Sequence, residues 1–235
     1  MDYSFPVIGL VHSCFKEKFG IPRQPGLAPL AQARIEILPP YNDPDAFVGL
    51  AGSSHIWLQF VFHQNRREEW KPKIKPPRLG GNKTLGVFAT RSPVRPAPIG
   101  LSVVQLLEVQ INQGVQLLVG GADLLDGTPI LDIKPYIPYT DKIDGASNSF
   151  APAAPTIIPV IWPAELKAHC SSRLDYGVNL VALIEQILQQ DPKPPYHKIE
   201  PERIYGMRLF DGDLRWRYAG TPDAYVIEVV DFADK

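Results

Sequence analysis

The sequence has no apolar run of the roughly 18 residues that a membrane span requires, and we expect no secretory leader at its start. The first residues, MDYSFPVIGLVHS, lack the basic start and the long apolar stretch of a signal peptide. Cysteine is scarce: Cys14 and Cys170 are too few and too far apart for a disulfide framework or a zinc site, so we interpret them as inert packing residues. We therefore expect a soluble cytoplasmic protein that has no membrane partner and binds no metal.

Several catalytic motifs are also missing. There is no GxGxxG after a strand, no phosphate-binding GxxxxGK[ST] and no GxSxG nucleophile elbow. The five histidines show neither HExxH nor a paired ligand spacing. These absences disfavour a classical dinucleotide-binding fold and a zinc hydrolase.

Proline, in contrast, is in excess, with 25 among 235 residues where about 5% is usual. Proline removes a backbone donor and clashes inside helices, so this content and the 18 glycines argue against a helical bundle. Short strands joined by rigid turns fit better. Apolar runs and alternating patterns predict strands at 7–11, 34–38, 55–62, 85–90, 100–111, 115–120 and 129–134.

The pattern changes after residues 135–160, a stretch without periodicity that we interpret as a long connection. Residues 164–190 are predicted to be helical, with a candidate N-cap at Asn179 and an end at Asp191-Pro192. An apolar stripe runs along it: Leu180, Val181, Ile184, Ile187 and Leu188. Short strands follow at 203–210, 214–218 and 224–230, with a hairpin signal at Asp211-Gly212. We expect a mainly β domain over 1–155 and a small α+β domain over 160–235.

The net charge of −1 hides a basic segment at 66–95. This segment contains nine Lys or Arg and two acids, a net charge of +7, which leaves −8 for the rest of the chain. A localised basic stretch predicts a surface for a polyanion. The alternative is a solvated loop, but Trp70 and several prolines interrupt the charges.

Polar and special-backbone residues are concentrated in a few strings. These are PRQPG (22–26), FVFHQ (60–64), GVFATRSPVRPAPIGLS (86–102), DLLDGTPILDIKPYIPY (123–139) and QDPKPPY (190–196). In this order they closely resemble the TrmO (YaeB-like) family of S-adenosylmethionine-dependent tRNA N6-methyltransferases. These enzymes methylate the exocyclic nitrogen of threonylcarbamoyladenosine beside the anticodon.

The resemblance implies a fold that composition alone does not predict. The family's first domain is a single small β-barrel, and the enzyme works as a homodimer with cofactor sites near the subunit interface. One departure is visible, because Ala97 stands where many members have Asn in the RPNPIG string. That departure puts a side-chain role at position 97 in doubt.

The resemblance also implies the residues that contact S-adenosylmethionine. Gly26 and Gly127 let backbone approach a ligand closely, Arg91 can hold a carboxylate bidentately, and two leucines can cover the adenine faces. The implied set is Gln24, Pro25, Gly26, His63, Gln64, Arg91, Leu101, Leu125, Asp126, Gly127, Thr128 and Pro129. For the 126–129 string a plain turn is an equally good interpretation, and the two are compatible.

The reaction requires a group that accepts a proton from N6. The sequence does not single out that base. Asp126, Asp132 and His63 are the candidates.

RNA contacts are predicted on the basic segment, with Trp70 as a stacking platform for an unstacked base of the tRNA anticodon loop. Tyr136 and Tyr139 are equally compatible with core packing and with base stacking. The cationic contacts are Arg66, Arg67, Lys71, Lys73, Lys75, Arg78, Lys83 and Arg95.

Two other classes of function remain open on these residues. One is a non-catalytic regulator that binds S-adenosylmethionine and RNA, and the other is a β-barrel module for protein interaction. Transfer of a labelled methyl group to tRNA distinguishes the first from an enzyme, and the second predicts no cofactor binding.

Overall fold

The structure is a computed structural model of the chain. It describes residues 3–65, 69–76, 83–174, 176–194, 197–200, 202–221 and 224–234. The chain forms two compact units, each built from several segments. The first comprises 1–12, 33–119 and 127–154, and the second comprises 13–32, 120–126 and 155–235. The second unit thus includes two segments that lie within the sequence-predicted first domain.

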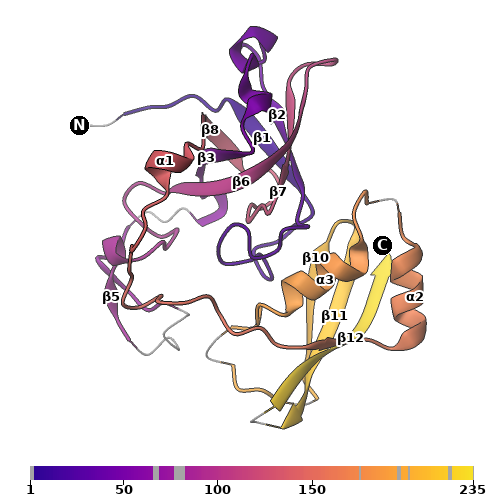
Figure 1. The fold of residues 1–235 in the computed structure, drawn as a ribbon. Coiled ribbons are helices and arrows are strands. Elements are labelled where there is room, and N and C mark those ends of the chain that lie inside the picture. Colours follow the sequence, from indigo (N-terminus) through magenta and orange to yellow (C-terminus); the bar gives the residue numbers. More distant parts are fainter. Residues whose placement is uncertain are drawn as a thin grey trace. The chain divides into compact units, whose positions relative to one another are not determined.

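A closed barrel of six strands dominates the first unit, in the neighbour order β1-β2-β7-β6-β3-β8 (Figure 1). Its strands are β1 (Gly9–Ser13), β2 (Ala33–Ile37), β3 (His55–Val61), β6 (Ile99–Gln110), β7 (Gln116–Gly120) and β8 (Pro129–Pro135). The barrel implied by the family resemblance is therefore confirmed.

Alternation along β3 shows why these residues close a barrel. Ile56, Leu58 and Phe60 are buried and face inward, whereas the residues between them face outward. Gly100 of β6 lies opposite Phe60, and a Cβ at Gly100 would come within 2.2 Å of the Phe60 ring. Position 100 therefore requires a residue without a side chain, because the Phe60 ring fills this part of the barrel interior.

Short elements decorate the barrel unit. They are η1 (Pro44–Phe47), η2 (Leu50–Gly52), η3 (His63–Asn65), β4 (Lys73–Ile74), β5 (Leu85–Gly86), η5 (Val87–Ala89) and α1 (Pro138–Asp141). The predicted strand at 85–90 is wrong beyond Gly86. The backbone N–H and the hydroxyl of Thr90 both donate to the Val87 carbonyl, which turns the chain instead.

In its described residues, the second unit has a four-stranded sheet of order β10-β11-β12-β9 and two helices. The bounds are β9 (Val160–Ile161), α2 (Ala164–Ser172), α3 (Leu180–Leu188), β10 (Ile204–Leu209), β11 (Gly212–Thr221) and β12 (Ala224–Asp234). The single predicted helix over 164–190 is wrong: it is two helices, with Gly177 at φ +69° in the break. The predicted N-cap is confirmed, because Asn179 Oδ1 accepts from the Ala182 N–H at 3.0 Å.

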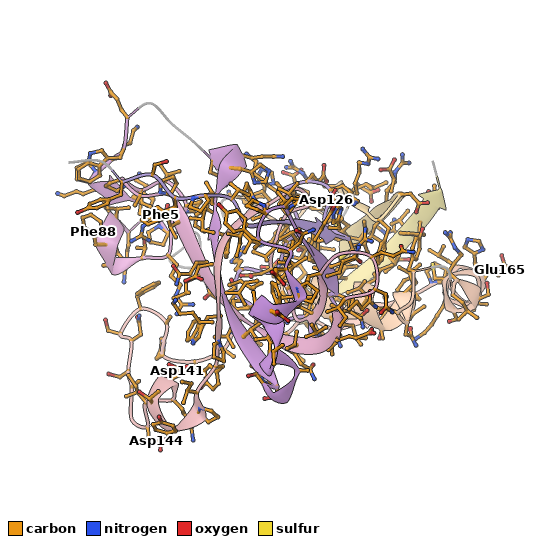
Figure 2. All side chains as sticks on the ribbon, turned by 90° about the horizontal axis from the view of Figure 1, so that it is seen from above. Phe5, Phe88, Asp126, Asp141, Asp144 and Glu165 are labelled. Atoms are coloured by element: carbon orange, nitrogen blue, oxygen red, sulfur yellow. The ribbon has the colours of Figure 1, made fainter. Side chains whose placement is uncertain are left out.

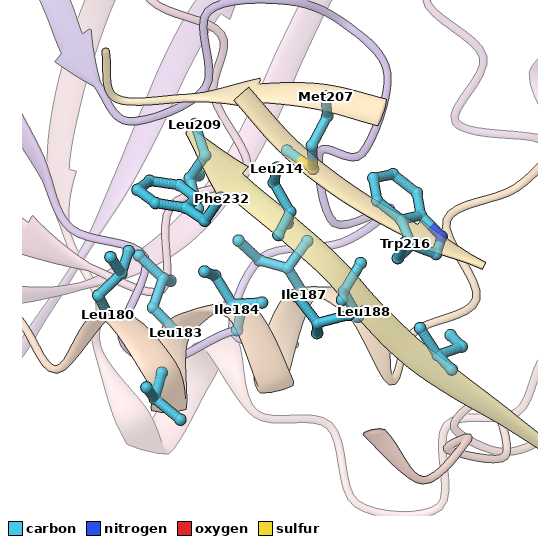
Figure 3. Packing of buried hydrophobic residues seen from close by; sticks show 14 of the residues in the cluster. Leu180, Leu183, Ile184, Ile187, Leu188, Met207, Leu209, Leu214, Trp216 and Phe232 are labelled. Carbon is cyan, nitrogen blue, oxygen red and sulfur yellow. The ribbon is translucent and has the colours of Figure 1, made fainter. Parts of the chain in front are cut away.

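The core of this unit lies between α3 and the sheet. Figure 3 shows Leu183, Ile184 and Ile187 pointing toward the strands that carry Leu214 and Phe232. The N-terminal segment of the same unit joins this core through four small or aromatic side chains: Cys14, Phe15, Ala28 and Ala31. Among the described residues, no helix has the length and apolarity to cross a membrane.

Both cysteines lie in this core, with Cys14 1% and Cys170 0% exposed. Burial raises the pKa of the Cys14 thiol to about 12. Because only the thiolate reacts readily, Cys14 should stay protonated and inert throughout the neutral and mildly alkaline range.

We expect a disulfide reagent such as dithionitrobenzoate to label neither cysteine in the folded protein between pH 7 and 9. Both should react after unfolding in guanidinium, as measured by released thionitrobenzoate. A thiol that reacts at once in the native protein would contradict the burial described here.

Candidate functional site

The turn between residues 126 and 129 is pinned to the first barrel strand. The Gly127 N–H donates to the Val11 carbonyl at 2.7 Å, and the Val11 N–H donates to the Thr128 carbonyl at 3.0 Å. Gly127 has φ +74°, and no atom lies within 4 Å of the place where its Cβ would stand. The turn therefore combines a fixed backbone with open space at Gly127, which is what close approach of a ligand requires.

On the preceding residue, the carboxylate of Asp126 is held from two sides. Its Oδ1 accepts from the Ser13 backbone N–H at 2.8 Å, and its Oδ2 forms an ion pair with Lys16 Nζ at 3.0 Å. The buried Ser13 hydroxyl donates to the Leu124 carbonyl at 2.7 Å. Ser13 thus holds the 124–126 loop through both its backbone and its side chain, and we call these two hydrogen bonds the Ser13 clasp.

A glycine loop of the second unit shows the same use of backbone. The Gly26 N–H donates to the Gly121 carbonyl at 2.9 Å, and a Cβ on Gly121 would stand 3.2 Å from the Gly26 Cα. Gly26 itself, at φ +77°, has no atom within 4 Å of its Cβ position. Gln24 and Pro25, which precede it, are partly exposed.

Three barrel strands place predicted residues in one row. In the antiparallel register Leu101 of β6 lies opposite Gln59 of β3, and Gln59 lies opposite Asp132 of β8. Directly opposite residues share a face, so all three are on the outer face, where Leu101 is 52% exposed. Asp132 forms an ion pair with Lys134 at 2.7 Å and also accepts from the Ile133 N–H at 2.9 Å.

His63 and Gln64 lie in the short helix η3, which begins one residue beyond β3. The Phe62 N–H donates to the Pro98 carbonyl at 2.8 Å, so this end of β3 is tied to the proline-rich segment. Leu125, in the second unit, is buried, in contrast to the exposed Leu101. The proposed roles of these residues as adenine and ribose contacts stay predictions.

The proline-rich segment around Arg91 is held by side chains because its prolines supply no backbone donors. Thr90 Oγ1 accepts from the Ser92 N–H at 3.3 Å, and Arg95 Nη1 donates to the Thr90 carbonyl at 3.2 Å. Arg91 lies between these contacts with its side chain exposed. At the departure from the family pattern, the Ala97 carbonyl still accepts from the Ile99 N–H at 2.8 Å, which needs no particular side chain.

Within the basic segment, β4 and β5 form a two-stranded antiparallel sheet, here called the basic hairpin, in which Lys73 lies opposite Gly86 and Ile74 opposite Leu85. Exposed side chains line it: Trp70, Lys71, Lys73, Lys75 and Lys83. Three further predicted contacts, Arg66, Arg67 and Arg78, lie outside the described residues.

The two tyrosines of the 123–139 string differ. Tyr136 is partly buried against the rings of Trp57 and His55, at centroid distances of 6.0 and 6.3 Å. Tyr139 is 89% exposed. Core packing therefore describes Tyr136 and not Tyr139.

Sequence reasoning missed Ser13, Lys16 and Phe88. Ser13 and Lys16 act on a loop more than 100 residues away, and no local pattern signals that pairing. Phe88 belongs to an apolar run that resembles a buried strand, yet its ring is exposed. The described residues contain no cluster of three or more His, Cys, Asp or Glu side chains that could hold a metal ion.

Comparison with known proteins identifies the family of this chain. The family described as the tRNA-methyltransferase O N-terminal domain matches residues 10–142, and the TrmO C-terminal domain matches residues 155–232. A putative S-adenosylmethionine-dependent methyltransferase of Pseudomonas aeruginosa is 48% identical over 99% of both chains. The tRNA (adenine(37)-N6)-methyltransferase of Escherichia coli is 44% identical over 92% of this chain and 93% of its own.

A crystal structure of TrmO from Pseudomonas aeruginosa superposes with a TM-score of 0.82 at 43% identity, covering 100% of this chain and 98% of that one. With its six-stranded barrel and glycine turns, the protein thus has a barrel-type fold and not the sheet of a dinucleotide-binding protein. The chain belongs to the TrmO family, over both of its domains.

The Ser13 clasp generates a prediction. Ser13→Ala removes the donor to a buried carbonyl, which costs about 1–3 kcal/mol and loosens the loop that carries Leu125 and Asp126. We expect roughly tenfold weaker binding of S-adenosylhomocysteine in isothermal titration.

Two matched variants separate positioning from general destabilisation. Ser13→Thr keeps the hydroxyl and should restore the affinity, and Ser171→Ala, which removes an exposed helix hydroxyl, should leave it unchanged. Equal cofactor affinity in Ser13→Ala and Ser171→Ala would show that Ser13 does not position the loop.

Proposed function

We propose that this protein transfers a methyl group from S-adenosylmethionine to the N6 nitrogen of the adenosine beside the tRNA anticodon, with threonylcarbamoyladenosine as the modified base. The observation that carries the proposal is 44% identity to a tRNA (adenine(37)-N6)-methyltransferase over 92% of the chain. Relatives of the same name in Eikenella corrodens and Homo sapiens support it. The cofactor is S-adenosylmethionine, which the Pseudomonas aeruginosa relative's name also gives.

The described residues fit this cofactor. Gly26 and Gly127 leave open space beside fixed backbone, where main-chain groups can meet an adenine edge or a ribose. Arg91 is exposed and has the planar fork that binds a carboxylate bidentately. S-adenosylmethionine supplies a methyl group that its sulfonium has already activated, so the protein's main tasks are alignment and exclusion of water.

The acceptor nitrogen is a weak nucleophile, because its lone pair is delocalised into the purine and the neighbouring carbonyl. As N6 gains the methyl group it must lose a proton, and the candidates for the base are His63, Asp126 and Asp132. In the structure Asp126 accepts from Ser13 and pairs with Lys16, and Asp132 pairs with Lys134. Because both carboxylates already have these partners, we assign Asp126 and Asp132 an orienting role. His63 is therefore the candidate base to test first.

We assign RNA binding to the basic hairpin. Lys71, Lys73, Lys75 and Lys83 are exposed on a segment with a net charge of +7, and contacts with phosphates release counterions. The affinity for tRNA should therefore fall steeply with salt. The regulator alternative is not favoured, because the relatives are named as methyltransferases.

Two sets of variants test whether the lysines serve tRNA binding and Arg91 serves methyl transfer. Lys73→Glu combined with Lys75→Glu should weaken tRNA binding at least tenfold and leave binding of S-adenosylhomocysteine unchanged. Arg91→Ala should abolish methylation in a folded protein that still binds tRNA. The readouts are filter binding, isothermal titration and transfer of a radiolabelled methyl group to tRNA carrying threonylcarbamoyladenosine.

Loss of cofactor affinity in the double lysine variant would contradict its assignment to RNA. Full activity of Arg91→Ala would remove Arg91 from the site. No transfer by the unaltered protein to the modified tRNA would overturn the proposed function itself.

We further propose that the protein is a cytoplasmic homodimer. Its tRNA substrate supports that location, and the family resemblance supports the dimer. The outer face of β6 also exposes a row of apolar side chains, Ile99, Leu101 and Leu107, which are 39%, 52% and 40% exposed. Exposed apolar rows of this kind mark protein interfaces.

We expect light scattering after size-exclusion chromatography to give twice the chain mass of 26.1 kDa at micromolar concentration. Leu107→Glu should shift the protein toward the monomer, because it places a charge in the apolar row. Leu174→Glu, an equally radical change at an exposed leucine of the second unit, is the matched control. A monomeric unaltered protein would disprove the dimer.

A further inference from the structure

Two aromatic rings stand exposed beside each other on the basic hairpin. Phe88 is 72% and Trp70 48% exposed, and their ring centroids lie 6.3 Å apart with an interplanar angle of 38°. Figure 2 shows Phe88 at the periphery of the side chains. Rings of this size dominate the energetics of cores and interfaces, so a pair left in solvent points to a ligand.

The backbone beneath the rings is fixed even though the rings are exposed. Val87, directly before Phe88, is 1% exposed, and its N–H donates to the Pro72 carbonyl at 2.9 Å. After Phe88 the chain turns at Thr90, whose hydroxyl donates to the Val87 carbonyl at 2.8 Å. The Phe88 ring therefore projects from a structured turn, which lowers the entropy cost of binding a planar partner.

The surroundings of the ring pair are cationic. The Arg95 guanidinium carbon lies 5.9 Å from the centroid of the Phe88 ring, and Arg95 Nη1 donates to the Thr90 carbonyl. Lys71 and Lys73 follow Trp70 on the same hairpin, and both are exposed. Glu69 is the acid nearest in sequence among the described residues. Aromatic faces flanked by cations combine stacking with phosphate contacts, which is how proteins bind single-stranded nucleic acid.

We propose that Phe88, with Trp70, forms a stacking site for one unstacked base of the tRNA anticodon loop, and that Arg95 contacts the phosphate next to that base. This inference rests on the proposed function for its RNA, and it names a substrate contact, Phe88, that the sequence did not indicate. The charge on the hairpin favours RNA over a second copy of this chain, whose net charge is −1. Stacking on a ring face tolerates any base, so this site holds the loop open and leaves base identity to other contacts.

The experiment uses the full-length protein and an anticodon stem-loop RNA with 2-aminopurine placed at each loop position in turn. When 2-aminopurine stacks on an aromatic ring its fluorescence is quenched, so binding by the unaltered protein should quench one loop position selectively. Phe88→Leu keeps an apolar side chain without a ring. It should abolish that quenching and weaken binding roughly tenfold.

Phe88→Tyr keeps the ring and should behave as the unaltered protein does. Val48→Leu, at an exposed apolar position elsewhere in the barrel unit, is the matched control and should change nothing. Titration with S-adenosylhomocysteine and light scattering complete the set, and both should be the same for all variants.

The remaining outcomes distinguish a failure of this inference from a failure of the proposed function. Unchanged quenching in Phe88→Leu removes the stacking role, weaker binding of S-adenosylhomocysteine assigns Phe88 to the cofactor site, and an altered mass assigns it to an interface between copies. Unaltered protein that quenches the probe but transfers no methyl group overturns the proposed function and leaves the stacking site in place. Unaltered protein that does not bind the RNA overturns both.

Discussion

Pairing of the first barrel strand with the last one is the constraint on which the remaining structure depends. Gly9 and Leu10 of β1 lie opposite Ile130 and Pro129 of β8, and this pairing closes the barrel. The same ladder continues into the turn at Gly127 through the Val11 backbone. Barrel closure and the turn at Gly127 thereby share one hydrogen-bonded ladder, so a change in strand register would displace this turn together with the barrel wall.

Sequence patterns predicted the strands well where one face is buried. Alternation marks β2, and β-branched and aromatic residues mark β3; in both strands every second residue lies in the barrel interior. The same reasoning failed at 85–90, where Phe88 is exposed and the Thr90 hydroxyl turns the chain by donating to the Val87 carbonyl. It failed again in the helical region, where Gly177 separates α2 from α3 although the apolar stripe of α3 was predicted correctly.

Much of the candidate site could be named only through the family strings, because its residues come from distant segments. Asp126 is held by Ser13 and Lys16, which no spacing rule connects to it. Closure of the barrel was equally out of reach, since strand count and alternation are compatible with a sandwich as well. Side-chain contacts replace backbone donors around Arg91, and a proline-rich sequence does not reveal which hydroxyl does this.

The chain passes between its two compact units five times, after residues 12, 32, 119, 126 and 154. Phe15 and Ala28 belong to the core around α3, although in sequence they lie between β1 and β2. A cut near residue 155 would therefore separate the inserted segments 13–32 and 120–126 from the remainder of their compact unit, including the α3 core that Phe15 and Ala28 join. A design that exchanges the C-terminal part of this protein must therefore exchange these two inserted segments as well.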